Sequence, residues 1–370
     1  MRTTAWTTLA LSLAACRGTV VIDEALPTSA TAGGSGGGGS GGGGAGASTS
    51  SSSGGPCGDT TSDPHNCGAC GHDCLGGACT QSTCQPVILD SSGYPNGIAV
   101  TATDVYWTDL ISGVMRVPKG GGTAALIAMA DTPQAIALDA GHVYWTATNT
   151  LARAPIPAGA TQVLSSAPLK SGAWGLATDG TNVYYADQSA GSVTQMPVSG
   201  SSSVVQLAGN LVAPDGVVVD GTSVYFANGT NQQVQGSIVK VPIGGGPQTT
   251  LATGQKGPRA LALDSDSVYW TDSALYVPAT TGLVMKAPKA GGAATILTSG
   301  QGNPLGIAVN GGDVFFVNGD AGTVMRISTS GGTPEVLAQG QMYVTSIAAD
   351  AKAIYWTTQD QGGAVVKLAR

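Results

Sequence analysis

The hexapeptide Asp104-Val105-Tyr106-Trp107-Thr108-Asp109 is the first of seven related stretches in this chain of 370 residues. Each stretch has a valine or isoleucine followed by two aromatic residues, and the other six begin at His142, Asn182, Ser223, Ser267, Asp313 and Ala353. The first aromatic residues of successive stretches are 38, 40, 41, 44, 46 and 40 positions apart. A period near forty residues, built from short β-rich runs, is typical of a repeat architecture.

Each repeat divides into four strand-like pieces separated by glycine-rich turns. An apolar run such as residues 97–100 precedes the aromatic motif, and a third run such as residues 113–118 follows it. The fourth piece is short and more polar, as in residues 335–338. Four strands per repeat and seven repeats predict an all-β, seven-bladed β-propeller over residues 85–370.

The two ends of the repeat region complement each other. The last repeat ends with its third strand, at residues 363–370, and has no fourth. Residues 86–90, Pro-Val-Ile-Leu-Asp, match the fourth-strand pattern and precede the first repeat. We therefore expect this N-terminal strand to complete the last blade and close the ring.

The repeats also resemble a known class of propeller. Residues 258–264, Pro-Arg-Ala-Leu-Ala-Leu-Asp, lead into residues 268–272, Val-Tyr-Trp-Thr-Asp. This pattern resembles the YWTD propellers of LDL-receptor ectodomains, over about residues 86–370. Those domains have six blades whereas seven repeats are present here, and NHL-type propellers are the near alternative.

The N-terminus has the features of an exported chain. Arg2 precedes a short apolar run, residues 5–15, that is too short to span a bilayer. The run ends in Leu13-Ala14-Ala15-Cys16, which resembles the lipobox of bacterial lipoproteins. That resemblance implies that residues 1–16 are a lipoprotein signal ending at the lipobox cysteine, and that after cleavage Cys16 becomes the acylated N-terminus that anchors the chain in a bilayer. In that family, the absence of Asp after the cysteine implies that the lipoprotein is sent to the outer membrane. The alternative to a lipoprotein signal is an ordinary signal peptide with an incidental cysteine.

Two further segments precede the propeller. Residues 17–56 are rich in Gly, Ser, Ala and Thr, and we expect a flexible tether. Residues 57–84 hold six cysteines, and an exported chain predicts three disulfides with open connectivity among Cys57, Cys67, Cys70, Cys74, Cys79 and Cys84. The run Asn66–Cys74 resembles the NCGxCGxxC modules of secreted bacterial proteins, especially myxobacterial lipoproteins. Zinc bound by Cys67 and Cys70 with nearby histidines is the alternative.

Composition and motifs argue against several classes of function. The net charge is −7 and no Lys/Arg cluster is present, so we expect no nucleic-acid partner. The propeller region has one histidine, His142, and one glutamate, Glu335, at turn and outer-strand positions. Aspartates recur instead at equivalent positions, which indicates structural hydrogen bonds in turns. We assign no catalytic residue, cofactor or metal from the sequence.

Two functions from different classes remain. The first is a non-catalytic lipoprotein whose propeller binds a protein, peptide or glycan at one mouth of the ring. The alternative is a metal-assisted lactonase or lyase, similar to the gluconolactonase-like and streptogramin-lyase-like families.

Loop lengths suggest where a partner would bind. Most repeats have three residues between the motif and the third strand, but residues 229–235 and 273–281 form longer loops in the fourth and fifth repeats. Extra loop length is tolerated cheaply and often carries function, although these loops could also be unselected insertions. The candidate binding residues on this face are Asn231, Gln233, Tyr276, Lys256, Arg259 and Trp174.

The lipid anchor gives a direct prediction. Replacing Cys16 by serine removes the thiol that would be acylated, so the Cys16→Ser variant should move from the membrane pellet to the soluble fraction. Fractionation of cells followed by immunoblotting measures this. A variant that remains in the membrane fraction would contradict acylation at Cys16.

Overall fold

A computed structural model describes residues 58–165, 173–200, 203–229, 235–273, 281–360 and 362–370. Among these residues, one compact unit ends at Gln85 and a second begins at Pro86. The described residues include no helix long and apolar enough to cross a membrane.

The second unit is a β-propeller of seven antiparallel sheets, each with four strands. Blade 1 contains β4 (Pro95–Val100), β5 (Asp104–Asp109), β6 (Gly113–Pro118) and β7 (Ala125–Ala128). Blade 2 contains β8 (Ile136–Leu138), β9 (His142–Ala147), β10 (Thr150–Pro155) and β11 (Gln162–Ser165). Blade 3 contains β12 (Ala173–Thr178), β13 (Asn182–Asp187), β14 (Ser192–Pro197) and β15 (Val205–Ala208).

The remaining blades repeat this order. Blade 4 contains β16 (Val217–Val219), β17 (Ser223–Asn228), β18 (Gly236–Pro242) and β19 (Thr249–Gln255). Blade 5 contains β20 (Pro258–Leu263), β21 (Ser267–Asp272), β22 (Gly282–Pro288) and β23 (Thr295–Gln301). Blade 6 contains β24 (Pro304–Asn310), β25 (Asp313–Asn318), β26 (Thr323–Ser328) and β27 (Glu335–Ala338). Blade 7 contains β28 (Val344–Ala349), β29 (Ala353–Thr358), β30 (Ala364–Ala369) and β3 (Val87–Asp90).

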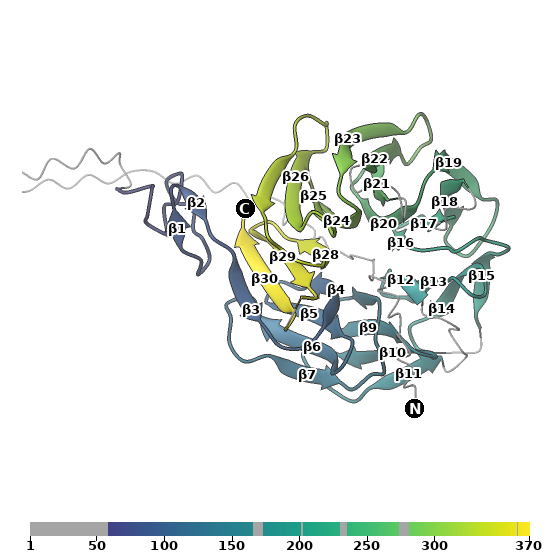
Figure 1. The fold of residues 1–370 in the computed structure, drawn as a ribbon. Coiled ribbons are helices and arrows are strands. Elements are labelled where there is room, and N and C mark those ends of the chain that lie inside the picture. The colour runs from purple at the N-terminus through teal and green to yellow at the C-terminus, as the bar shows by residue number, and fades with distance from the viewer. Residues whose placement is uncertain (1–57, 166–172, 201–202, 230–234, 274–280, 361) are drawn as a thin grey trace, which may run out of the picture. The chain divides into compact units, whose positions relative to one another are not determined.

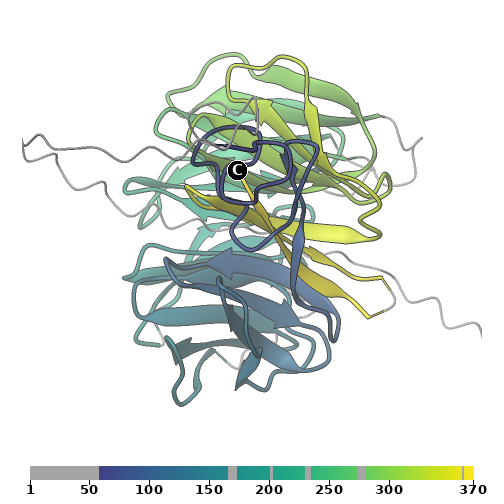
Figure 2. The same cartoon turned by 90° about the vertical axis from the view of Figure 1, so that its left-hand side faces the viewer.

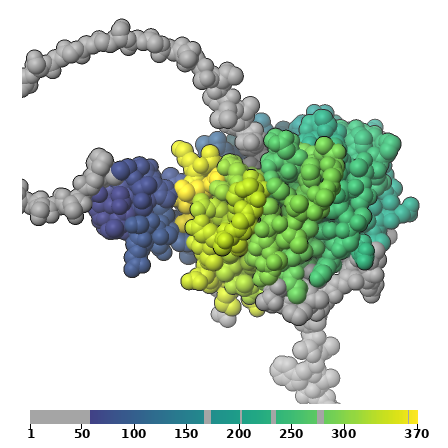
Figure 3. Space-filling model, turned by 90° about the horizontal axis from the view of Figure 1, so that it is seen from above, coloured from purple at the N-terminus to yellow at the C-terminus, as the bar shows by residue number. Residues whose placement is uncertain are grey.

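The first strands of the blades surround the centre of the ring. Each contacts the first strand of the next blade, from β4 through β8, β12, β16, β20, β24 and β28 back to β4 (Figure 1). Neighbouring blades pack side by side, as the green to yellow blades in Figure 3 show. The seven-bladed architecture expected from the repeats is therefore confirmed.

The N-terminal strand closes the last blade, as the sequence predicted. Strand β3 pairs antiparallel with β30, with Val87 opposite Lys367 and Ile88 opposite Val366. In Figure 2 the yellow strands of blade 7 lie between the blue first blade and the green blades. Blade 7 thus contains both ends of the propeller chain, held together without a covalent bond.

The aromatic motif fills the interfaces on both sides of each blade. Successive side chains of a strand point to opposite faces, so the two aromatic residues of a motif enter different interfaces. Tyr106 of blade 1 packs in one cluster with Trp145 of blade 2, while Tyr144 of blade 2 packs with Tyr185 of blade 3. The tryptophans at 107, 145, 270 and 356 are all buried. Each motif therefore joins its blade to both neighbours.

Threonines of the motif add hydrogen bonds between blades. The hydroxyl of Thr108 donates to the carbonyl of Gln134 at 2.8 Å, and Thr146 donates to Ala173 at 2.7 Å. Thr271 and Thr357 donate in the same way to Leu305 and Asn96. Each of these carbonyls lies at the start of the next blade's first strand or just before it. The threonines therefore fix how neighbouring blades are aligned along the axis of the ring.

Glycine is required where neighbouring first strands approach most closely. A Cβ atom on Gly216 would lie 2.4 Å from the carbonyl oxygen of Arg259, and one on Gly175 would lie 2.5 Å from that of Asp215. These separations are shorter than van der Waals contact, so a larger residue would push the blades apart.

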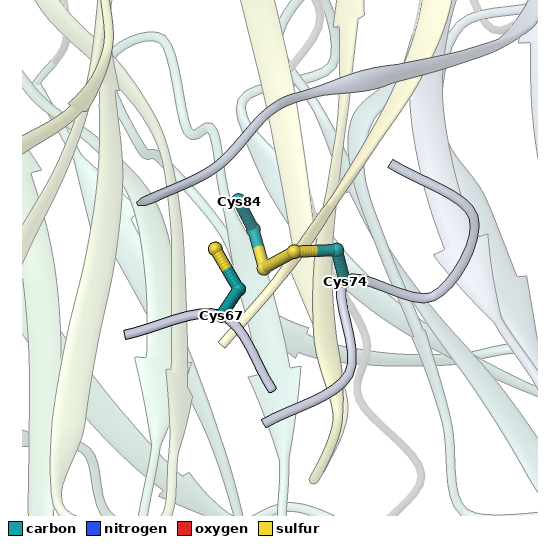
Figure 4. Close-up of side chains that lie close together, drawn as sticks. All are labelled: Cys67, Cys74 and Cys84. Atoms are coloured by element: carbon teal, nitrogen blue, oxygen red, sulfur yellow. A yellow bond between two sulfur atoms is a disulfide. The ribbon is translucent and has the colours of Figure 1, made fainter. Parts of the chain in front are cut away.

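The first unit is the cysteine module, with two short strands, β1 (Cys79–Thr80) and β2 (Thr83–Cys84). Disulfides join Cys67 to Cys79 and Cys74 to Cys84, and Cys70 is disulfide-bonded as well. Cys57 lies outside the described residues. The sulfur atoms of Cys67, Cys74 and Cys84 lie within 4.8 Å of one another (Figure 4). Because these sulfurs are in disulfides, they are not thiolates free to bind zinc, and the expected disulfide module is confirmed.

Ring closure by β3 predicts a large loss of stability on truncation. A chain that starts at Ser91 should have a much lower melting temperature than one that starts at Pro86, because it loses the β3–β30 hydrogen bonds and exposes the edge of blade 7. Thermal unfolding followed by circular dichroism measures the difference. Equal melting temperatures for the two chains would show that β3 does not stabilise the ring.

Candidate functional site

The central channel has two mouths with different chemistry. The turn mouth carries the turns between first and second strands, such as residues 139–141, 179–181 and 264–266. The connection mouth carries the residues through which the chain enters each first strand, namely Asn96, Gln134, Trp174, Asp215, Arg259, Leu305 and Thr345.

A cavity of about 410 Å³ lies at the turn mouth, between the C-terminal ends of the first strands of blades 2 to 6. Most of its lining is aliphatic, and the lining residues are Leu138, Asp139, Ala140, Ala177, Thr178, Asp179, Gly180, Val218, Val219, Ala262, Leu263, Ala308 and Val309. Clefts of this size and composition are the usual sites at which proteins bind small ligands or side chains of a partner.

The aspartates around this mouth have structural partners. In five blades the carboxylate that follows the first strand accepts a hydrogen bond from the hydroxyl of the first motif tyrosine, at 2.5 to 3.2 Å. The pairs are Asp139–Tyr144, Asp179–Tyr184, Asp220–Tyr225, Asp264–Tyr269 and Asp350–Tyr355. The other carboxylate oxygen accepts from backbone amides of the turn, as Asp264 does from Asp266 and Ser267. These aspartates therefore hold the turns, as their recurrence in the sequence indicated.

The two blades without this aspartate also differ at the tyrosine. Blade 1 has Thr101 in place of the aspartate, and the buried hydroxyl of Tyr106 makes no hydrogen bond of normal geometry in the described part of the chain, although the Arg116 side chain lies close enough to act on its pKa. Blade 6 has Asn310, and the first aromatic residue of its motif is Phe315, which has no hydroxyl group. The Arg370 guanidinium lies 4.7 Å from the Phe315 ring centroid and donates to Asn310.

Electrostatics agree with a structural role for these pairs. Burial would raise the pKa of Asp220, but amides of Thr222 and Ser223 and the Lys289 ammonium, 3.1 Å away, hold it at about 2. A carboxyl whose pKa is lower in the folded state adds stability above its ordinary pKa of 3.8 and loses it as the pH falls through about 2. Burial and the adjacent aspartate raise the pKa of Tyr269, so its hydroxyl stays protonated as a donor.

The aspartates at the motif ends are occupied too. Asp109 accepts from the amides of Tyr94, Ile111 and Ser112, and Asp272 accepts from those of Lys256 and Gly257. Outside the cysteine module, the residues that the structure describes include no three His, Cys, Asp or Glu ligand atoms within 4.8 Å of one another.

His142 is the histidine of the propeller and begins β9 next to the cavity. Its Nδ1 lies 3.5 Å from Oδ1 of the cavity residue Asp139, and its side chain is partly exposed. This pair places an imidazole beside a carboxylate at the turn mouth.

The binding residues expected from the sequence lie at the opposite mouth or outside the described residues. Asn231, Gln233 and Tyr276 fall outside the described ranges. Lys256 is exposed, whereas Trp174 is partly exposed and packs against the core between blades 2 and 3. Arg259 was expected on an exposed connection but is only 1% exposed, because it enters β20 where the neighbouring backbones meet.

Sequence reasoning missed the cavity because its lining resembles ordinary core. The residues preceding each turn, such as Val218-Val219 and Ala262-Leu263, are the apolar ends of first strands. Only the convergence of five first strands makes them a common surface. The sequence did contain a signal at the opposite mouth. When the repeats are aligned, Asp215 of blade 4 and Arg259 of blade 5 occupy equivalent positions and carry opposite charges.

The tyrosine–aspartate hydrogen bonds predict that a Tyr→Phe substitution changes the free energy of unfolding differently at positions 269 and 106. Tyr269→Phe should lower the free energy of unfolding by about 1–2 kcal/mol, because it removes a hydrogen bond and leaves an Asp264 oxygen without its donor. Tyr106→Phe should change it by less than about 0.5 kcal/mol or increase it, since the Tyr106 hydroxyl makes no hydrogen bond of normal geometry in the described residues. Urea denaturation of both variants measures this, and equal losses would contradict the assigned hydrogen bonds.

No protein-family model and no curated protein matches the sequence. Among solved structures, a streptogramin B lyase is 13% identical with a TM-score of 0.64, and the match covers 77% of this chain and 98% of that one. A catalytically inactive His-to-Ala variant of virginiamycin B lyase from Staphylococcus aureus, solved with quinupristin, is 16% identical with a TM-score of 0.64 and the same coverage. The WD40 propeller domain of Doa1 is 12% identical with a TM-score of 0.60, and covers 76% of this chain and 95% of that one. At these identities, the chain shares the propeller fold with lyases and with a WD40 domain alike.

Proposed function

We propose that the propeller is the binding domain of a lipid-anchored bacterial envelope protein, and that it takes apolar side chains of a protein or peptide into the cavity at the turn mouth. The observation that carries this proposal is the cavity of about 410 Å³, with aliphatic walls contributed by five blades. An apolar side chain buried there loses contact with water and gains contact with these walls, which favours binding.

The chemistry of the walls favours a protein or peptide over a glycan. A sugar would bring hydroxyl groups against a lining that is mostly aliphatic, and a buried hydroxyl without a partner is costly. The carboxylates of Asp139 and Asp179 already accept hydrogen bonds from tyrosines and turn amides.

The hydrogen bonds of the acidic residues also support a binding role. Chemistry at this mouth would need a carboxylate available to move protons or hold a metal, and the recurring aspartates are committed to turns. The metal-assisted lactonase or lyase remains the second candidate, and the contact between His142 and Asp139 beside the cavity is what favours it.

The envelope location rests on the N-terminal sequence. The Leu13-Ala14-Ala15-Cys16 stretch supports acylation at Cys16 and an outer-membrane anchor, and residues 17–56 would tether the folded units to it. The disulfides of the cysteine module agree with an oxidising compartment outside the cytoplasm.

Narrowing the cavity should weaken binding. Peptides selected from a random library on the immobilised protein should share an apolar residue, and Val219→Phe should raise their Kd by about tenfold or more, equivalent to about 1.4 kcal/mol. Val219 lines the cavity and is partly exposed. The matched control is Val163→Phe on β11, where Val163 is 54% exposed on an outer strand. Isothermal titration calorimetry measures both.

Two results would contradict this proposal. Unchanged affinity in Val219→Phe would place peptide binding elsewhere on the propeller. Turnover of a lactone or linear-peptide lactone by the purified protein, abolished by EDTA, would support the lyase alternative instead.

A further inference from the structure

Arg259 is a buried cation at the connection mouth, on the opposite side of the ring from the cavity. It is the second residue of β20 and is 1% exposed. Its Nε and Nη1 atoms are buried and have no hydrogen-bond partner in the described ranges. A guanidinium cannot lose its proton in a protein, so the charge itself is buried.

A buried charge without a partner is costly, and one that persists in a fold is normally matched by an acceptor. Outside the described residues, the loop segments 166–172, 201–202, 230–234 and 274–280 and position 361 contain no Asp or Glu, and the N-terminal segment 1–57 contains Asp23 and Glu24. The Asp272 carboxylate, one turn further along blade 5, is held by the amides of Lys256 and Gly257.

Elsewhere at this mouth, the equivalent polar residues satisfy one another. Asn96 donates from Nδ2 to Oε1 of Gln134 in the next blade at 3.2 Å, and Gln359 donates to Asn96. Blades 4 and 5 instead place Asp215 and Arg259 at adjacent positions. Asp215 is equally buried and has a contact of its own. The backbones are close here, since a Cβ on Gly216 would lie 2.4 Å from the Arg259 carbonyl.

We infer that Arg259 is the recognition group of an anion site at the connection mouth, separate from the apolar cavity, and that its ligand carries a carboxylate. A guanidinium N–H donates a charge-assisted hydrogen bond to a carboxylate oxygen, and the Nε and Nη1 donors of Arg259 have no acceptor in the described ranges. The exposed Lys256 on the same connection would draw an anion toward this mouth. The neighbouring Asp215 would repel a doubly charged sulfate or phosphate more strongly than a singly charged carboxylate.

Thermal unfolding of the full chain at constant ionic strength tests this. N-acetylglycine, which has the carboxylate of a peptide C-terminus, and glucuronate, which has that of an acidic sugar, are the two probes. At least one should raise the melting temperature by a few degrees in a saturable manner, because a ligand that binds only the folded state stabilises it. Chloride and the uncharged N-acetylglycinamide should not. The probe with the lower saturation midpoint identifies the source of the carboxylate.

Variants of Arg259 distinguish a role in binding a ligand from a role in a structural ion pair. Arg259→Met should abolish the carboxylate-dependent rise and should melt no lower than the parent without carboxylate, because it removes a buried cation whose Nε and Nη1 make no hydrogen bond in the described ranges. Lys352→Met, which removes an exposed cation at the other mouth, should retain the rise. Where Arg259→Met does not fold, Arg259→Lys is measured instead, and its titration midpoint should be about tenfold or more higher because an ammonium cannot place N–H donors where the guanidinium does.

Three results would overturn the inference. The first is a parent protein whose melting temperature does not respond to either carboxylate. The second is a rise that persists in Arg259→Met, which would place the anion elsewhere. The third is a large loss of melting temperature in both Arg259→Met and Asp215→Asn without carboxylate, which would make the two residues a structural ion pair.

Discussion

Each blade of this propeller has two apolar faces, and the rest of the structure follows from the need to bury both. Neighbouring aromatic residues of the motif, such as Tyr144 and Trp145, enter different interfaces because side chains alternate along a strand. A blade in isolation would expose one or both of these rings to water. An open stack of blades would still leave two apolar faces at its ends, so only a closed ring buries all of them.

The polar groups of the repeat are arranged so that this burial is not opposed by unsatisfied hydrogen bonds. The tyrosine hydroxyl reaches the turn aspartate, whose other oxygen caps the turn amides, and the motif threonine donates to the next blade. One hexapeptide therefore fixes a turn, fills two interfaces and sets the register between blades. The recurring aspartates are therefore used to hold the structure. Residues that differ from the repeat, among them His142 and Arg259, are the better candidates for function.

The sequence predicted the architecture well because the fold is repeated. Because the same pattern occurs seven times, an ambiguous strand in one repeat can be assigned from the others. The last repeat lacks a fourth strand, and residues 86–90 fit the pattern of that strand. The site was less predictable for a physical reason. Val219 and Leu263 are ordinary apolar residues locally, and they line a cavity only because blades 2 to 6 converge there. Arg259 was expected to add positive charge to the connection between blades 4 and 5, whereas the close approach of the first strands buries it.

The closing strand gives this chain an unusual order of assembly. Strand β3 is the first propeller strand to be synthesised, and its partner β30 is the last, so the two meet only when the chain is complete. Contacts between such distant segments form late and slowly. Until then, Ile88 and the backbone of β3 remain an open edge, available to strands of other chains. The cysteine module immediately before β3 contains two disulfides of short sequence separation, 10 and 12 residues, so it can fold without waiting for the propeller.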